Sequence, residues 1–180
     1  MKEIKDFSPD VIIRPIQFSD LKRIYGWLKQ SDIIESILLG KRINALEEEI
    51  KWFEKYSKDD TKNVFAIEFK HHHVGNASLF NIDKFHGRAN LSIFIGDENC
   101  RGKGLGYETL RIVLNFAFNN MSLYRISLEV LEDNLHAINC YKKIGMQEEG
   151  ILRSYVNIQN RRCNMIVFSI LRDEFFRANQ

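Results

Sequence analysis

A glycine-rich stretch from Cys100 to Glu108 constrains this chain more than any other part of its sequence. An apolar run at residues 91–96 precedes the stretch, and apolar residues at helical spacing follow it at positions 110, 113, 114 and 117. Glycine allows the backbone to curl tightly and to approach a ligand closely. The unpaired N–H groups at the start of a helix, together with the helix dipole, favour a bound anion. The order of strand, glycine turn and helix therefore predicts a pyrophosphate-binding loop formed by Gly102, Gly104 and Gly106, with Arg101 and Lys103 at its rim.

The spacing of the glycines separates this loop from two other phosphate-binding motifs. A P-loop needs a Gly-Lys pair followed by Ser or Thr, but Gly102-Lys103 is followed by Gly104. The dinucleotide fingerprint needs a glycine three residues after its second one, and Tyr107 or Thr109 stands there instead. The alternative to an anion site is a glycine-rich helix entry that binds no ligand.

Two segments resemble the cofactor motifs of the GNAT superfamily of N-acetyltransferases. Arg101-x-x-Gly104-x-Gly106 is similar to the acetyl-coenzyme A motif of that family, (Gln/Arg)-x-x-Gly-x-(Gly/Ala). Further downstream, Asn134-x-x-Ala137-x-x-x-Tyr141-x-Lys143-x-Gly145-Met146 resembles its second cofactor segment. The closing Gly150-x-Leu152-Arg153 and the strands expected after it resemble the RimJ/RimL branch, which also contains polyamine and amino-sugar acetyltransferases. The resemblance covers essentially the whole chain.

The resemblance implies an α/β (α+β) fold, with a mixed, mostly antiparallel sheet of about seven strands flanked by about four helices. It also implies that the fourth and fifth strands splay apart in a V and admit the pantetheine arm of acetyl-CoA like an extra strand. Backbone N–H groups near Phe94 and Ile95 would then face the thioester carbonyl, and Asn134 would hydrogen-bond the pantetheine amides. The residues implied to hold the cofactor are Phe94, Ile95, Arg101, Gly102, Lys103, Gly104, Leu105, Gly106, Asn134 and Tyr141.

Acetylation of an amine sets the chemistry that such a site must supply. A primary amine with a pKa of about 10.4 is mostly protonated at neutral pH, so the site must take up one proton and return one to the departing thiolate. The resemblance implies that Tyr141 is this general acid, and the alternative is an ordinary core aromatic.

The general base has three candidates. Glu129 matches the glutamate that some relatives use as base, directly or through a water, and the alternative is an exposed strand carboxylate. Many RimJ/RimL-type relatives carry a glutamate where this chain has Asn90, and an amide cannot accept the proton. A chain of waters leading to backbone carbonyls is the third possibility.

The acceptor pocket is expected from residues 31–42, 80–88 and 155–157, in which cations are at least as frequent as carboxylates. A polyamine site should present several carboxylates, because its substrate is multiply positive. This composition favours a nucleotide-linked amino sugar, and residues 128–134 are similar to the branch that acetylates such sugars during pseudaminic-acid synthesis. A polyamine, a protein N-terminus and an aminoglycoside are the alternatives. The residues expected to contact the acceptor are Glu35, Phe80, His86, Asn90 and Tyr155.

Length and composition predict a single domain spanning residues 1–180, since 44% hydrophobic residues suffice for a sizeable core. The formal net charge of +2 is too small to indicate nucleic acid or a membrane surface as partner. Three widely spaced cysteines indicate free thiols, and no apolar leader or long apolar run occurs, so we expect a cytoplasmic protein. A homodimer is possible. The alternatives to an enzyme are a non-catalytic acyl-CoA-binding module and a nucleotide-binding regulator.

Periodicity predicts the remaining elements. Strands are expected near residues 11–13, 64–69, 74–82, 89–95, 124–130, 146–157 and 164–171. Helices are expected to begin at Ser19 or Asp20, at a capping box formed by residues 44–47, after the glycine stretch and near Asn134. Residues 31–43 have no clear period and are expected to form a loop. Glu47 to Glu49 are expected to be a solvated first turn, and the adjacent histidines 71–73 a solvated hairpin tip without a metal ion.

Overall fold

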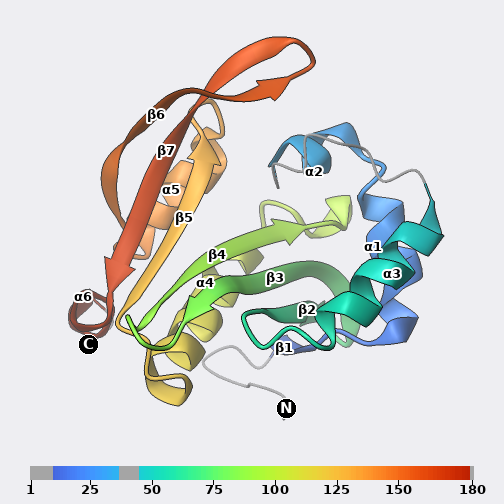
Figure 1. The fold of residues 1–180 in the computed structure, drawn as a ribbon, viewed down its shortest axis with the longest axis horizontal. Helices are drawn as coiled ribbons and strands as arrows, with labels where there is room; N and C mark the ends of the chain where they lie inside the picture. Colours follow the sequence, from blue (N-terminus) through green and yellow to red (C-terminus); the bar gives the residue numbers. More distant parts are fainter. Residues whose placement is uncertain (1–9, 37–44, 179–180) are drawn as a thin grey trace.

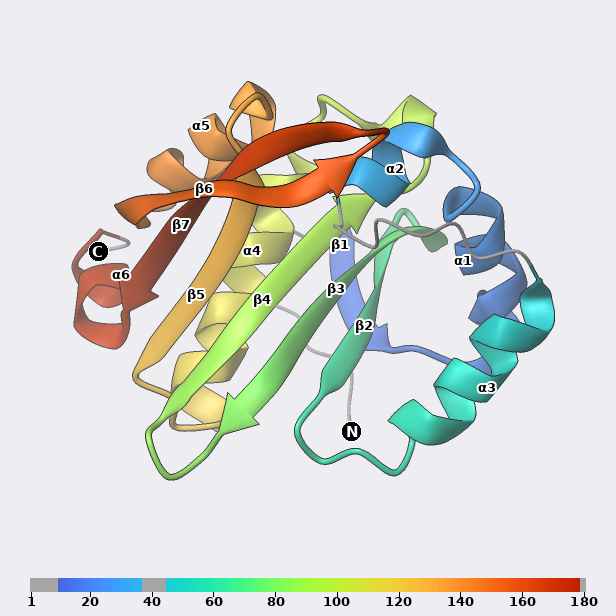
Figure 2. The same ribbon diagram turned by 45° about the horizontal axis from the view of Figure 1, so that its top comes forward.

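The computed structural model describes residues 10–36 and 45–178, which form one seven-stranded sheet with helices packed against it (Figures 1 and 2). The strand order is β1-β2-β3-β4-β5-β7-β6, and only the β4–β5 pair is parallel. The strands are β1 (Val11–Pro15), β2 (Asn63–Phe69), β3 (His72–Asp83), β4 (Arg88–Ile95), β5 (Arg125–Leu131), β6 (Gln147–Ile158) and β7 (Arg161–Leu171). The mixed, mostly antiparallel sheet expected from the sequence is therefore confirmed.

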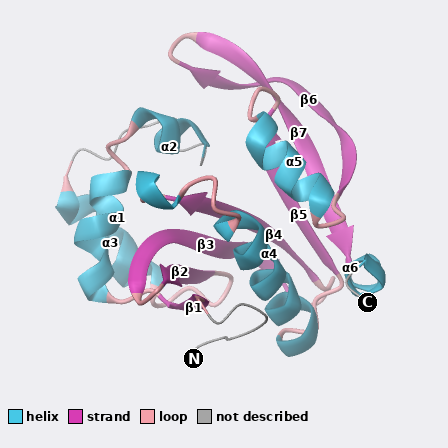
Figure 3. Cartoon of the chain, turned by 180° about the vertical axis from the view of Figure 1, so that it is seen from behind, coloured by secondary structure: helices cyan, strands magenta, loops and turns pink. Residues whose placement is uncertain are grey.

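Hydrophobic clusters cover both faces of the sheet. Strand β2 shows this, because its successive side chains point to opposite faces. Phe65 and Ile67 belong to the cluster that contains α4, whereas Val64 and Ala66 belong to the cluster that contains α1. Helices α4 and α5 lie on the same face of the sheet (Figure 3). The helices are α1 (Leu21–Trp27), α2 (Ser31–Ser36), α3 (Leu46–Tyr56), α4 (Leu105–Asn115), α5 (Leu135–Lys143) and α6 (Arg172–Ala178), with short segments η1 (Phe18–Asp20), η2 (Glu98–Cys100) and η3 (Phe116–Asn120).

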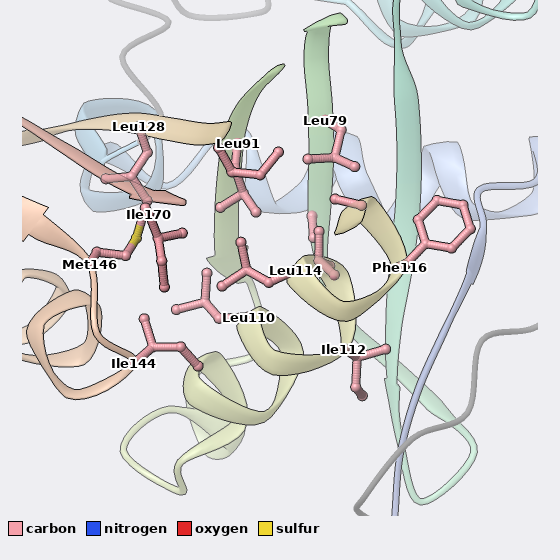
Figure 4. Close-up of a cluster of buried hydrophobic side chains, with 14 of the residues drawn as sticks. Leu79, Leu91, Leu110, Ile112, Leu114, Phe116, Leu128, Ile144, Met146 and Ile170 are labelled. Carbon is pink, nitrogen blue, oxygen red and sulfur yellow. The ribbon is translucent and has the colours of Figure 1, made fainter. Parts of the chain in front are cut away.

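The largest hydrophobic core lies between α4 and the middle of the sheet (Figure 4). Leu110 and Leu114 of α4, four residues apart on one helix face, lie among leucines of three strands. These are Leu79 of β3, Leu91 of β4 and Leu128 of β5, and all five leucines are at most 3% exposed. This packing fixes the start of α4, and with it the glycine stretch, relative to β4 and β5.

Strands β4 and β5 separate after a short parallel ladder. The ladder consists of three pairs, Arg88 with Arg125, Ala89 with Ile126 and Asn90 with Ser127. Beyond Asn90, β4 continues along β3 to Ile95, while β5 continues along β7 to Leu131. The two strands diverge in Figure 1, as the predicted V requires.

The loop predicted at residues 31–43 is wrong for its first six residues, which form α2. Ile33 and Ile34 are 2% and 6% exposed. A helix this short is unstable alone, so it depends on this packing, which the sequence pattern does not reveal. The rest of the predicted loop and Asn44, the expected cap of α3, lie outside the described residues. Helix α3 begins at Leu46 after Ala45, which provides no side-chain cap.

Glu49, expected in a solvated turn, is instead buried and only 4% exposed. Burial, together with the neighbouring charge of Glu48, raises the pKa of Glu49 to about 7. Glu47 and Glu48 are exposed, as expected. The run of three glutamates therefore has one member that faces the protein rather than the solvent.

The histidine run at the β2–β3 hairpin is also only partly solvated. His71 and His72 are exposed, whereas His73 is 6% exposed. The His73 ring packs edge-on against Trp27, with 4.8 Å between ring centroids, and its Nδ1 lies 3.4 Å from Asp20 Oδ1. Burial lowers the pKa of His73 despite this carboxylate. The expectation of a solvated tip is wrong for His73 because α1 packs over the start of β3.

Candidate active site

The predicted anion-binding loop has a backbone conformation that favours glycine. Gly102 and Gly104 have φ angles of 72° and 79°, in the left-handed region where other residues are strained. Gly104 immediately precedes α4, so the unpaired N–H groups of the first helical turn lie next to it. A Cβ atom at either glycine would meet no heavy atom within 4 Å. The backbone is thus bordered by open space, which fits an anion such as pyrophosphate.

A cleft of about 530 Å³ is lined by this loop, by the end of β4 and by one side of α5. Most residues expected to hold the cofactor line it, namely Phe94, Ile95, Arg101, Gly102, Gly104, Leu105, Gly106, Asn134 and Tyr141. The remaining one, Lys103, is exposed and is not part of the lining. The structure therefore brings two distant sequence segments to one cleft.

The backbone groups of β4 alternate between β3 and the open side of the V. Gly96 faces β3, because its N–H donates to Val74 O at 2.8 Å. Gly87 faces the β5 side, because its carbonyl accepts from Tyr124 N at 2.6 Å. By alternation, Ile93 and Ile95 face the open side and Phe94 faces β3. Of the two predicted backbone donors, only Ile95 is thus placed toward the cleft.

Tyr141 lies on α5, where it packs in the core and also lines the cleft. It is 8% exposed, and its ring lies 6.0 Å from that of Phe168 between centroids. Burial is the main cause that raises the pKa of the Tyr141 phenol above its ordinary value. The hydroxyl therefore keeps its proton at neutral pH and can donate it. Tyr141 is thus a core aromatic that also lines the cleft, and its role as general acid stays a prediction.

The start of α5 is fixed by Asn134, whose Oδ1 accepts from Ala137 N at 3.2 Å. This cap uses the oxygen of the side chain and leaves its NH₂ group as a donor. At the end of α5, Lys143 Nζ lies 4.6 Å from the ring centroid of Tyr107 on α4. Both line the cleft, so this cation is held beside the cofactor loop. Neither residue was predicted to hold the cofactor, although Tyr107 directly follows the first motif and Lys143 stands in the second.

Further cleft residues were missed because they belong to elements whose facing sides depend on packing. Gly106 approaches α5 closely, since a Cβ atom there would lie 4.0 Å from Cys140 Sγ. The additional lining residues are Asp32, Ile33, Ile93, Cys100, Leu110, His136, Ala137, Asn139 and Cys140. Of these, Ala137 stands in the second matched motif, and strand alternation pairs Ile93 with Ile95.

Glu129 and Asn90 lie on the face of the sheet opposite to α4. On β5, Leu128 and Val130 belong to the core beneath α4, so Glu129 and Ser127 point the other way. Asn90 Nδ2 donates to Ser127 Oγ at 3.4 Å, across the last pair of the β4–β5 ladder. Glu129 is half-buried and lies two residues further along β5, where the V has opened.

The residues expected to contact the acceptor are spread over several elements. Phe80 of β3 pairs with Asn90 of β4 and is half-buried. His86 is exposed in the β3–β4 hairpin, and Tyr155 of β6 is 54% exposed. Glu35 belongs to α2, but its side chain is outside the part of the chain that the structure describes. The structure thus pairs Phe80 with Asn90, whereas His86 lies in the connection between their strands and Tyr155 lies on β6.

The fold and the cleft are those of a transferase. Its cofactor loop precedes helix α4, and the gap between the parallel strands β4 and β5 lies beside this loop. The family model described as "Acetyltransferase (GNAT) domain" matches residues 10–147, and the chain belongs to this family. It is therefore an N-acetyltransferase that uses acetyl-CoA, as the motifs predict. No helix among the residues described is long and apolar enough to span a membrane.

Several relatives act on polyamines by name. The spermidine N(1)-acetyltransferase of Escherichia coli (strain K12) is 26% identical, and the match covers 94% of this chain and 90% of that protein. The spermidine N(1)-acetyltransferase of Vibrio cholerae is 24% identical, with 96% and 99% covered. The crystal structure of spermidine N-acetyltransferase from Vibrio cholerae with CoA and spermine has a TM-score of 0.88 at 22% identity, covering 94% and 99%. These relatives support the superfamily and not specifically the RimJ/RimL branch.

Proposed function

We propose that this chain acetylates a primary amine of a linear polyamine such as spermidine or spermine. The observation that carries the proposal is the similarity to spermidine acetyltransferases over more than nine-tenths of the chain. A polyamine was an alternative to the nucleotide-linked amino sugar favoured by charge composition, and it now takes first place.

One of the cations in the expected acceptor segments, Arg88, is balanced by a carboxylate in the fold, and so is Arg125, its neighbour across the β4–β5 ladder. Arg88 Nε lies 3.4 Å from Asp83 Oδ2, and Arg125 Nη1 donates to Glu149 Oε1 at 2.7 Å. Both arginines lie in the first pair of the β4–β5 ladder, at the closed end of the V. Their charges are therefore balanced by carboxylates and do not make the open part of the V positive.

In this proposal, acetyl-CoA supplies the acetyl group as an activated thioester. The backbone at Gly102 to Gly106 holds its anionic end through helix N–H groups. The N–H group of Ile95, which faces the open side of β4, is the donor for the carbonyl oxygen. Tyr141, protonated in its buried position, gives its proton to the leaving thiolate.

Glu129 is the proposed base that takes up the amine proton, directly or through a water. It points away from the α4 side of the sheet, so the amine and the acetyl donor would reach the V from opposite faces. Asn90 cannot accept the proton, and its amide instead donates across the ladder to Ser127. This placement gives the acid and the base separate environments.

Replacement of the phenol tests this assignment. Tyr141→Phe should lower kcat by about 100-fold or more, the contribution typical of a general acid, while the Kd for acetyl-CoA stays within about twofold because the loop is unchanged. Tyr124→Phe, which alters an exposed tyrosine, is the matched control. An unchanged kcat in Tyr141→Phe would remove Tyr141 from the mechanism.

An acceptor screen with detection of the free thiol of CoA tests the substrate class. Spermidine and spermine should be acetylated with a higher kcat/KM than nucleotide-linked amino sugars, aminoglycosides or peptides. A preference for the amino sugar would contradict the proposal, and binding of acetyl-CoA without any turnover would favour the non-catalytic module.

A homodimer stays a prediction, which light scattering of the purified protein tests.

A further inference from the structure

The side chain of Arg101 makes three hydrogen bonds to protein groups at the rim of the cofactor cleft. Its Nε donates to Ile95 O at 3.0 Å, its Nη2 donates to Gln30 Oε1 at 3.1 Å, and its Nη1 donates to Asp32 Oδ2 at 2.6 Å. Arg101 is thus committed to protein acceptors, although its position in the motif suggests a free cation beside the pyrophosphate.

These three acceptors belong to parts of the fold that are far apart in sequence. Ile95 ends β4, Gln30 lies between α1 and α2, and Asp32 is in the first turn of α2. Asp32 and Ile33 line the cleft together with Arg101, so α2 forms part of the cleft wall. The Arg101 guanidinium therefore joins the end of β4 to this wall.

We propose that Arg101 is a positioning residue that fastens α2 against the end of β4. Residues 31–42 are also expected to line the acceptor pocket, so in this role Asp32 assists acceptor binding by holding that wall in place and does not bind the substrate ammonium itself. The inference rests on the proposed acetyl transfer to an amine, but it does not depend on which amine is used.

The size of α2 is the physical reason for such a fastening. Six residues form too few internal hydrogen bonds for a stable helix, so α2 needs tertiary anchors. One anchor is the burial of Ile33 and Ile34, and the other is the Arg101 network. An exposed Arg–Asp pair alone contributes little, but here the same planar group also donates to a backbone carbonyl and to Gln30.

Two variants test the fastening. Asp32→Asn keeps the shape of the side chain and removes its charge, and Arg101→Lys keeps the charge but cannot reach three acceptors with one planar group. Both should raise the acceptor KM by about three- to fivefold, the range expected for a half-exposed pair. The Kd for acetyl-CoA should stay within about twofold, because the backbone N–H groups at the loop are unchanged. Asp59→Asn, which removes the partner of Lys62 outside the expected acceptor segments, is the matched control.

Hydrogen exchange gives a second measurement that needs no acceptor. Amides of residues 31–36 should exchange faster in both variants than in the unmodified protein, whereas those of α4 should not change. A KM increase confined to multiply charged amines, with unchanged exchange in α2, would show that Asp32 binds the ammonium and would overturn the proposal. A large loss of acetyl-CoA affinity in Arg101→Lys with unchanged exchange would show that Arg101 is a phosphate ligand and would overturn it too. If no polyamine is acetylated, the proposed function fails, but the exchange result still decides the role of Arg101.

Discussion

Gly104 illustrates how a single backbone angle can support a binding site. Its φ of 79° is strained for any residue with a Cβ atom, and the position before α4 places it beside the unpaired N–H groups of that helix. The glycine is thus required by both the turn and the close approach of a ligand.

Gly104→Ala should therefore weaken both folding and acetyl-CoA binding. The left-handed conformation costs about 1–2 kcal/mol for a residue with a Cβ, and the added methyl group enters the open space before the loop. Gly26→Ala in α1 is the matched control, because a Cβ there also meets nothing within 4 Å and its φ is not left-handed. Urea denaturation and calorimetric titration measure the two effects. Unchanged acetyl-CoA affinity would contradict the anion-binding role of the loop.

Glu49 provides a test of burial at the residue scale. The pKa of Glu49 is raised from 4.5 to about 7 in the folded protein. Between these values the folded state binds more protons than the unfolded state, so the stability contributed by protonated Glu49 is present below pH 4.5 and is lost as the pH rises toward 7. The full loss is at most about 3 kcal/mol, from the size of the pKa difference.

Glu49→Gln removes this titration and should raise the free energy of unfolding at pH 8 relative to the unmodified protein, with a much smaller difference at pH 4.5. Urea denaturation at the two pH values measures it. Glu48→Gln, at an exposed neighbouring position, should show little dependence on pH. Equal effects of Glu49→Gln at both pH values would show that Glu49 is not buried as a protonated acid.

At the scale of elements, the end of β4 is shaped by α1. A Cβ atom at Gly96 would lie 2.1 Å from the Trp27 ring, far inside any allowed contact. Trp27 also packs edge-on against Phe94, with 6.1 Å between ring centroids. Helix α1 thus presses on the strand end that faces the cofactor cleft.

Gly96→Ala should destabilise the protein by about 1–3 kcal/mol, the cost typical of overpacking. Trp27→Leu should also destabilise it, because the smaller side chain leaves space against Phe94. The double variant should be less destabilised than the sum of the two, since the smaller residue makes room for the methyl group. A double-mutant cycle in urea measures the coupling. Strict additivity would mean that the ring and the glycine do not press on each other.

Most elements could be predicted from the sequence, and the exceptions have physical causes. The strands of the V were located within one or two residues, because their apolar residues form short runs bounded by turn signals. Helix α2 was missed because its stability comes from Ile33, Ile34 and Arg101, which pattern alone does not reveal. In the site, glycine spacing located the loop and the motifs located Tyr141. Which N–H groups of β4 face the cleft required the register with β3.

At the scale of the whole molecule, the sheet has two parts joined by little hydrogen bonding. One part consists of β1 to β4, and the other consists of β5, β7 and β6. Three residue pairs connect β4 with β5, whereas seven residue pairs connect β5 with β7. The main core compensates, because it contains Val11 of β1, Phe175 of α6 and the buried face of α4 between them. The shared core therefore favours unfolding as a single cooperative unit, and the single domain stays a prediction.

Two spectroscopic probes can test this cooperativity. Both tryptophans, Trp27 and Trp52, lie in α1 and α3, so fluorescence reports the part formed by β1 to β4. Far-ultraviolet circular dichroism reports both parts. The two urea transitions should coincide if the chain unfolds as one unit. Separate midpoints would show that the sheet consists of two independently unfolding parts.

Binding of acetyl-CoA should strengthen the connection between the two parts. A ligand in the V would contact loop residues that follow β4 and residues of α5 that follow β5, so it should stabilise both parts together. At a concentration of 100 times Kd the stabilisation is about 2.7 kcal/mol, which corresponds to roughly 5–10 °C in Tm for a chain of this size. The shift should appear equally in fluorescence and circular dichroism, and ATP at the same concentration should give a much smaller one. A shift seen by only one probe would mean that the ligand contacts only one part and does not bridge the V.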